Sequence, residues 1–137
     1  MNKSTIRELT FKLLYSLDIQ KSYEDEDIEL YFEDMELESN QVKNQIKEEI
    51  NGIIENNDSL LNLISNNLKS DWKLERISKV NIAFLKLAIY EMLYKKVPYK
   101  VVINEVVELA KKYGEDTSSS FINGVLATVV KENNLSE

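Results

Sequence analysis

The chain has 137 residues, of which 43% are hydrophobic, and this length suits one compact domain with a buried core. It has a formal net charge of −7 and contains neither cysteine nor histidine, which excludes thiol nucleophiles, Ser-His relays, disulfides and thiolate or imidazole zinc sites. Three glycines and one proline leave few positions for turns, so the composition predicts an all-α protein.

Periodic apolar residues predict the first two helices. The first spans residues 5–20, and Thr5 and Glu8 have the spacing of a capping box at its start. A short acidic helix follows over residues 27–36. Its apolar positions are expected to face inward, and these are Ile28, Tyr31, Phe32 and Met35.

Two amphipathic helices follow the acidic one. The third helix is predicted to begin at Ser39, whose hydroxyl can cap it, and the fourth at Asn57 or Asp58. Isoleucines and leucines recur in both at helical spacing, with polar residues between them. Both are therefore expected to lie at the surface with one apolar face buried.

The segment over residues 74–94 has apolar residues on nearly all sides, which is typical of a central helix. Pro98 is predicted to end it, because proline lacks the backbone donor that a helix needs. A sixth helix is predicted over residues 101–113, with Gly114 as a left-handed C-cap. A seventh helix is predicted to begin at Thr117 or Ser118, where a hydroxyl can cap it.

The candidate catalytic groups have simpler structural explanations. Glu105 and Glu108 have the i,i+3 spacing seen in di-iron bundles, but those sites are completed by histidines, which this chain lacks. The hydroxyls of residues 118–120 have no histidine base, so helix capping explains them better than nucleophilic catalysis. The sequence thus predicts no enzyme activity, no metal and no cofactor.

The N-terminus has no apolar signal segment, and no apolar run approaches the ~20 residues of a membrane span. The sequence therefore predicts a cytoplasmic protein without a membrane partner.

The charge is unevenly distributed. Residues 22–58 hold thirteen acidic and two basic residues, whereas residues 1–21 and 59–137 each have a net charge of +2. Eight basic residues lie within residues 69–100. Charge alone leaves two interpretations open, a positive face for a polyanion and ordinary solvated helix surfaces.

Basic and aromatic residues together favour a single-stranded RNA partner, because phosphates bind cations and splayed bases stack on aromatic rings. Lys3 lies just before the first predicted helix and Arg7 and Lys12 lie on it, with Tyr15 close behind. Lys100 and Phe121 lie near the starts of the last two helices. Each aromatic ring taken alone is better explained as part of the core than as an RNA contact.

Several blocks in order along the chain resemble the NusB family of bacterial transcription antitermination factors. The blocks span nearly the whole chain and are residues 7–15, 72–76, 85–91, 98–111 and 121–126. The resemblance implies a fold of seven helices in two roughly perpendicular three-helix bundles. It also implies binding of the boxA element of nascent RNA together with ribosomal protein S10 (NusE), within an RNA polymerase antitermination complex.

By position, the resemblance assigns RNA contacts to Arg7, Tyr15, Lys100, Ser118 and Phe121. Lys3 and Lys12 join this candidate RNA site because of their charge and their place beside or on the first helix. The S10 surface is expected near Glu75 and Lys79.

The sequence departs from the family pattern where an arginine-rich run is common, since residues 3–5 are Lys-Ser-Thr. Fewer phosphate contacts are therefore expected, which makes the protein partner important. Two alternatives stay open: the RNA-binding part of a ribosomal RNA methyltransferase system, and a purely protein-binding module whose acidic segment meets a basic partner. The sequence also leaves open whether the chain forms a homodimer.

Overall fold

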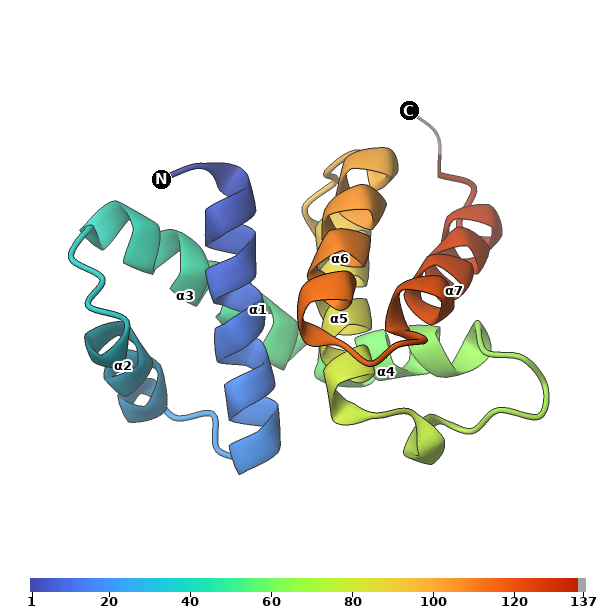
Figure 1. Cartoon of the computed structure of the whole chain (residues 1–137), viewed down its shortest axis with the longest axis horizontal. Helices are drawn as coiled ribbons and strands as arrows, with labels where there is room; N and C mark the ends of the chain where they lie inside the picture. The colour runs from blue at the N-terminus through green and yellow to red at the C-terminus, as the bar shows by residue number, and fades with distance from the viewer. Residues whose placement is uncertain (136–137) are drawn as a thin grey trace. The chain divides into compact units, whose positions relative to one another are not determined.

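The structure is a computed structural model that describes residues 1–135, and this range contains seven α-helices and no β-strand. The all-α prediction is therefore confirmed. The chain divides into two compact units, Met1–Glu55 and a second unit that begins at Asn56. Helices α1 to α3 belong to the first unit and α4 to α7 to the second, and Figure 1 labels each of them. The last two residues of the predicted domain lie outside the described range.

The first unit consists of α1 (Lys3–Gln20), α2 (Asp25–Asp34) and α3 (Asn40–Glu55), with α1 packed against the other two. The Tyr31 hydroxyl donates a hydrogen bond of 2.9 Å to the Leu9 carbonyl and so joins α2 to α1. The core of this unit is formed by Phe11, Leu13, Leu14, Leu17, Ile28, Phe32, Ile46, Ile50 and Ile53.

The starts of α1 and α2 differ from prediction, whereas the start of α3 agrees. α2 begins at Asp25, two residues before the predicted start at residue 27. Asn2, rather than Thr5, caps α1: the Asn2 Oδ1 accepts a hydrogen bond of 2.8 Å from the Thr5 amide. Ser39 caps α3 as predicted, with its hydroxyl accepting from the Val42 amide at 3.2 Å. The prediction for Met35 is wrong, because it follows the end of α2 and is 40% exposed.

The second unit is built around α5 (Lys79–Ile89), which contacts three other helices of the unit. Nine of its eleven residues are buried, as expected of a central helix. The elements around it are α4 (Asn57–Asn66), the short 3₁₀ turn η1 (Leu74–Arg76), the π-helical turn η2 (Tyr90–Tyr94), α6 (Tyr99–Tyr113) and α7 (Ser118–Glu132).

The boundaries of the central helix differ from prediction. It begins at Lys79 because the Ser78 hydroxyl accepts from the Asn81 amide at 3.3 Å, which leaves η1 as a separate turn. Its π-helical continuation ends at Tyr94, and Lys96 then adopts a left-handed φ of 58°. Pro98 therefore does not end this helix. It immediately precedes α6, where its fixed φ is compatible with a helix start.

Gly114 joins α6 to α7 but is not the predicted left-handed cap, since its φ and ψ are −90° and −170°. The structure needs glycine there for a different reason. A Cβ at this position would lie 2.6 Å from the Ala110 carbonyl oxygen and 2.6 Å from both side-chain atoms of Ser118. Only a residue without a side chain allows this close approach.

Candidate nucleic-acid interface

α1 carries four of the predicted RNA-contacting residues, and three of them reach the surface. Lys3 is exposed at the first residue of the helix, whereas Lys12 and Tyr15 are partly buried. The Tyr15 ring is nearly parallel to the ring of Phe11, with centroids 6.0 Å apart. Because Phe11 belongs to the core, this stacking holds Tyr15 in place and leaves part of its ring available to a ligand.

Arg7, the fourth residue on α1, is only 9% exposed. The sequence predicts that Arg7 extends into solvent to contact a phosphate, but its side chain is mostly buried although a guanidinium is always charged in proteins. Arg7 can meet RNA only through its small exposed part.

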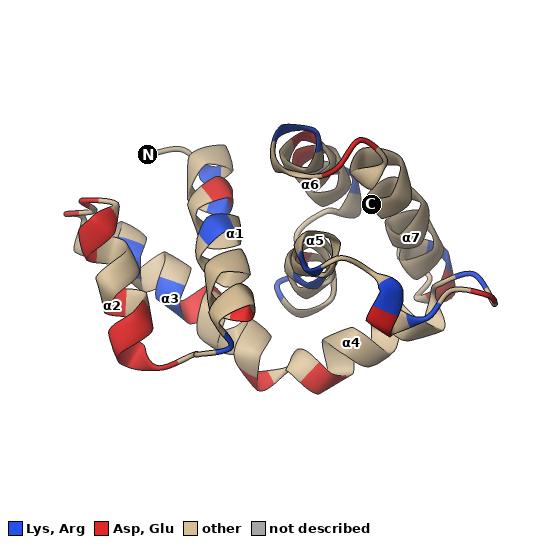
Figure 2. Cartoon of the chain, turned by 60° about the horizontal axis from the view of Figure 1, so that its bottom comes forward, with Lys and Arg blue, Asp and Glu red and all other residues tan. Residues whose placement is uncertain are grey.

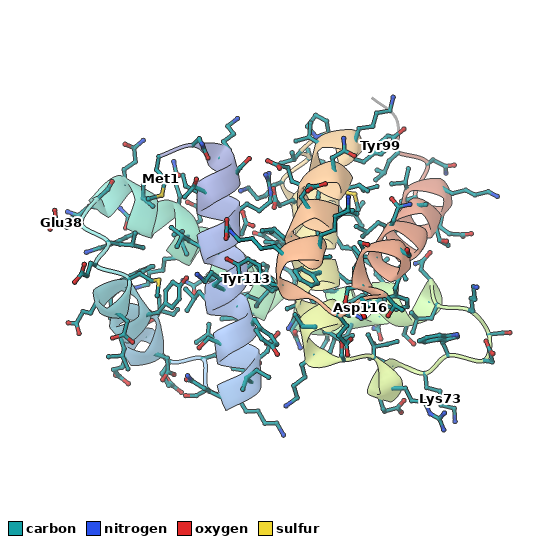
Figure 3. All side chains as sticks on the ribbon, viewed as in Figure 1. Met1, Glu38, Lys73, Tyr99, Tyr113 and Asp116 are labelled. Carbon is teal, nitrogen blue, oxygen red and sulfur yellow. The ribbon has the colours of Figure 1, made fainter. Side chains whose placement is uncertain are left out.

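The N-terminal turn of α6 presents Lys100 to solvent. The sequence predicts this residue just before the helix, but α6 begins at Tyr99, two residues before the predicted start at residue 101; Tyr99 is labelled in Figure 3. The first turn of a helix carries backbone N–H groups without intrahelical partners and a partial positive charge. Lys100 therefore lies where both the side chain and the backbone favour an anion.

Ser118 does not lie at the surface, and its prediction as an RNA contact is corrected here. The residue is 0% exposed. Its hydroxyl donates to Asn81 Oδ1 at 2.7 Å and accepts from the Glu115 amide at 2.8 Å. Both interactions are made inside the protein, so Ser118 positions the start of α7.

Phe121, one turn into α7, is partly exposed and stacks on Trp72. The two ring centroids are 5.5 Å apart with an interplanar angle of 26°. Trp72 is 47% exposed on the segment between α4 and η1. Trp72 is not among the site residues predicted from the sequence. It is, however, the chain's one tryptophan and lies in a polar, non-periodic stretch, which could have indicated a surface role.

The two residues predicted to contact S10 are both exposed. Glu75 lies in η1, and Lys79 is the first residue of α5. Glu75 belongs to the same connection between α4 and α5 as Trp72, and Lys79 directly follows this connection. This connection thus presents charged and aromatic side chains together.

The acidic segment of the sequence forms a distinct surface. Figure 2 shows acidic residues along much of α2, whereas basic residues lie on the N-terminal half of α1. In the first turn of α2 all three residues, Asp25, Glu26 and Asp27, are acidic, and the side chains of Glu24 and Asp27 form a reciprocal capping box. A phosphate backbone would be repelled from α2.

Metal-binding clusters and membrane-spanning helices are both absent from the described residues. Residues 1–135 contain no group of three or more His, Cys, Asp or Glu side chains that could hold a metal ion. In the same range, no helix combines the length and the apolar character that crossing a membrane requires.

The sequence is similar to a family of known proteins. The model of the NusB family matches residues 4–131. The transcription antitermination protein NusB of Acetivibrio thermocellus is 43% identical over 132 residues, which cover 96% of this chain and 90% of that protein. Its counterpart in Ruminiclostridium cellulolyticum is 40% identical over 132 residues, with the same coverage of both chains.

Solved structures are similar in fold. T. maritima NusB matches with a TM-score of 0.84 and 33% identity, covering 96% of this chain and 92% of that one. A second structure, of antitermination factors NusB and NusE in complex with dsRNA, contains a chain that matches with a TM-score of 0.85 and 21% identity, covering 95% of this chain and 96% of that one. The second likeness concerns the fold alone.

Proposed function

This chain belongs to the NusB family, and we propose that it is a transcription antitermination factor that binds boxA RNA together with ribosomal protein S10 (NusE). The family match over residues 4–131 carries this proposal. The curated relatives are named as transcription antitermination proteins, and an antitermination factor is not an enzyme. The complex would promote transcription of ribosomal RNA operons in the cytoplasm, where RNA polymerase acts.

We propose that both units contribute to RNA binding, as one RNA-binding domain. In the first unit, Lys3 and Lys12 supply positive charge and Tyr15 supplies a partly exposed ring. In the second unit, Lys100 and Phe121 supply the same two kinds of group. Cations neutralise phosphates and rings stack on unpaired bases, which together suit a single-stranded RNA.

Only a few cations lie in the proposed RNA site, namely Lys3, Lys12 and Lys100, which predicts weak binding by the protein alone. With about 3–5 phosphates neutralised, the slope of log K against log salt for single-stranded RNA is roughly −2 to −3.5. A partner that adds its own contacts would raise the affinity. We propose S10 as that partner, with Glu75 and Lys79 in its contact surface, and the assembly as part of the RNA polymerase antitermination complex.

The proposal is tested by fluorescence anisotropy with a labelled boxA RNA and a scrambled RNA of equal length, each with and without S10. We expect boxA to bind more tightly than the scrambled RNA, and S10 to increase that difference. Equal binding of both RNAs, unchanged by S10, would contradict the antitermination role. Binding of S10 without any RNA binding would instead indicate a purely protein-binding module.

The same samples address the oligomeric state. Size-exclusion chromatography with light scattering distinguishes a monomer from a homodimer, in the absence and presence of boxA RNA. A dimer that dissociates when RNA is added would mean that the copies cover the RNA-binding residues.

A further inference from the structure

The strongest unassigned feature of the second unit is the exposed indole of Trp72. Tryptophan is a large apolar residue, yet this one is 47% exposed and lies on an irregular segment instead of in the core. A turn closed by the hydrogen bond of 2.9 Å from the Trp72 amide to the Lys69 carbonyl holds its backbone. Trp72 is thus an ordered, solvent-facing aromatic plate.

The Phe121 ring stacks against the Trp72 indole. Their ring centroids lie 5.5 Å apart at an interplanar angle of 26°, which is an offset stacked arrangement. Phe121 is fixed in turn by α7, whose first residue, Ser118, is anchored to α5 by the Asn81 hydrogen bond. The contact therefore joins residues 49 positions apart in sequence, and it leaves a further area of the indole open for a third flat group.

Basic residues both precede and follow Trp72 in the sequence. Exposed basic residues at positions 69, 73, 76 and 79 outnumber the acidic residues at positions 71 and 75. Figure 3 labels one of them, Lys73, on the segment that carries Trp72. Proteins bind single-stranded nucleic acid by combining exposed aromatic rings, on which bases stack, with nearby cations that contact the phosphates.

We propose that Trp72 and Phe121, here called the Trp72 platform, stack an unpaired RNA base, while Lys69, Lys73 and Arg76 neutralise adjoining phosphates. This inference rests on the proposed RNA-binding function and adds a residue and a contact mode to it. Stacking of a base on an aromatic side chain is sequence-tolerant, because every base has a π-face. The platform therefore contributes affinity and positioning more than base discrimination.

The test uses the tryptophan itself. Because Trp72 is the chain's one tryptophan, intrinsic fluorescence excited at the indole reports on this position. Titrating the full chain with single-stranded boxA RNA, without S10, should change the emission with the same Kd as an anisotropy titration. Trp72→Ala should weaken RNA binding by roughly 5- to 100-fold, and Trp72→Phe should restore most of the loss.

Tyr23 provides the matched control. It is also an exposed aromatic, at 41%, but its hydroxyl donates to the Asp18 carboxylate at 2.6 Å and acidic residues follow it in sequence. Tyr23→Ala should leave RNA affinity unchanged. Circular dichroism of each variant checks that the helices are intact.

The outcomes distinguish failure of base stacking on the Trp72 platform from failure of the proposed antitermination function. Wild-type emission that stays constant at saturating RNA, or a folded Trp72→Ala variant with wild-type affinity, would overturn the platform while leaving antitermination intact. The same is true if Trp72→Ala weakens S10 binding alone, since the platform would then be a protein contact. Stacking with equal affinity for boxA and scrambled RNA would support the platform and contradict the boxA function.

Discussion

The Ser118 hydroxyl donates a hydrogen bond of 2.7 Å to the Asn81 side-chain oxygen, and both residues are buried although 37 positions separate them in sequence. This bond ties the first turn of α5 to the first turn of α7. It fixes the place where α7 begins and therefore where Phe121, one turn later, meets Trp72. A buried polar pair thus positions an aromatic group at the surface.

Ser118→Ala should lower the free energy of unfolding by about 1–3 kcal/mol, because it leaves Asn81 Oδ1 and the Glu115 amide without this partner in a buried site. Urea denaturation followed by circular dichroism measures the change. Ser120→Ala, at an exposed position two residues away, should change it by less than about 0.5 kcal/mol. Equal effects of the two substitutions would contradict the assignment.

Gly114→Ala and Gly124→Ala should have opposite effects on stability. At Gly114 the new Cβ would lie 2.6 Å from the backbone oxygen of Ala110, so the α6–α7 junction must shift at a cost of about 1–3 kcal/mol. At Gly124, within α7, nothing lies within 4 Å of the new Cβ, and alanine should stabilise the helix by about 0.5–1 kcal/mol. Thermal unfolding of the pair provides the comparison, and a destabilised Gly124→Ala variant would show that this helix face is packed.

Asn2→Ala should destabilise the start of α1 by about 1 kcal/mol, because the cap that accepts from the Thr5 amide is lost. Thr5→Ala serves as the control, since Thr5 contributes its backbone and not its hydroxyl to this cap. Hydrogen exchange of the first-turn amides gives the local readout. If Thr5→Ala were the more damaging change, the capping box expected from sequence would be the better description.

Lys100→Gln should weaken RNA binding and make the salt slope shallower by about 0.7, the value of one lost phosphate contact on a single strand. The melting temperature should stay near that of the wild type, because the side chain is exposed. Anisotropy titrations at several salt concentrations measure the slope. A uniform loss of affinity with an unchanged slope would mean that Lys100 does not contact a phosphate.

Arg7→Glu should behave differently from a surface charge reversal. The wild-type residue is 9% exposed, so the substitution places a carboxylate where a buried guanidinium lies and should cost about 2 kcal/mol or more of stability. Its effect on RNA must therefore be measured well below its melting temperature. Unchanged thermal stability of this variant would contradict a buried position of the Arg7 side chain and would indicate that RNA can reach it.

Much of the fold could be predicted from the sequence. The sequence predicts that the third helix begins at Ser39, and the structure caps it there. Its apolar circumference predicts a central helix over residues 74–94, which the structure contains with the shorter bounds of α5. Local sequence was less informative at junctions. Gly114 looked like a left-handed cap but is extended, and the break before Lys79 depends on the Ser78 cap.

The sequence by itself determined the helices, the charge asymmetry and the family, because helical periodicity, charge and motif order are properties of neighbouring residues. Only the tertiary structure decided which candidate site residues are accessible. It buried Ser118 against Asn81, left Arg7 only 9% exposed and placed Trp72 against Phe121. Burial and stacking are set by contacts between residues far apart in the chain, and no local pattern encodes them.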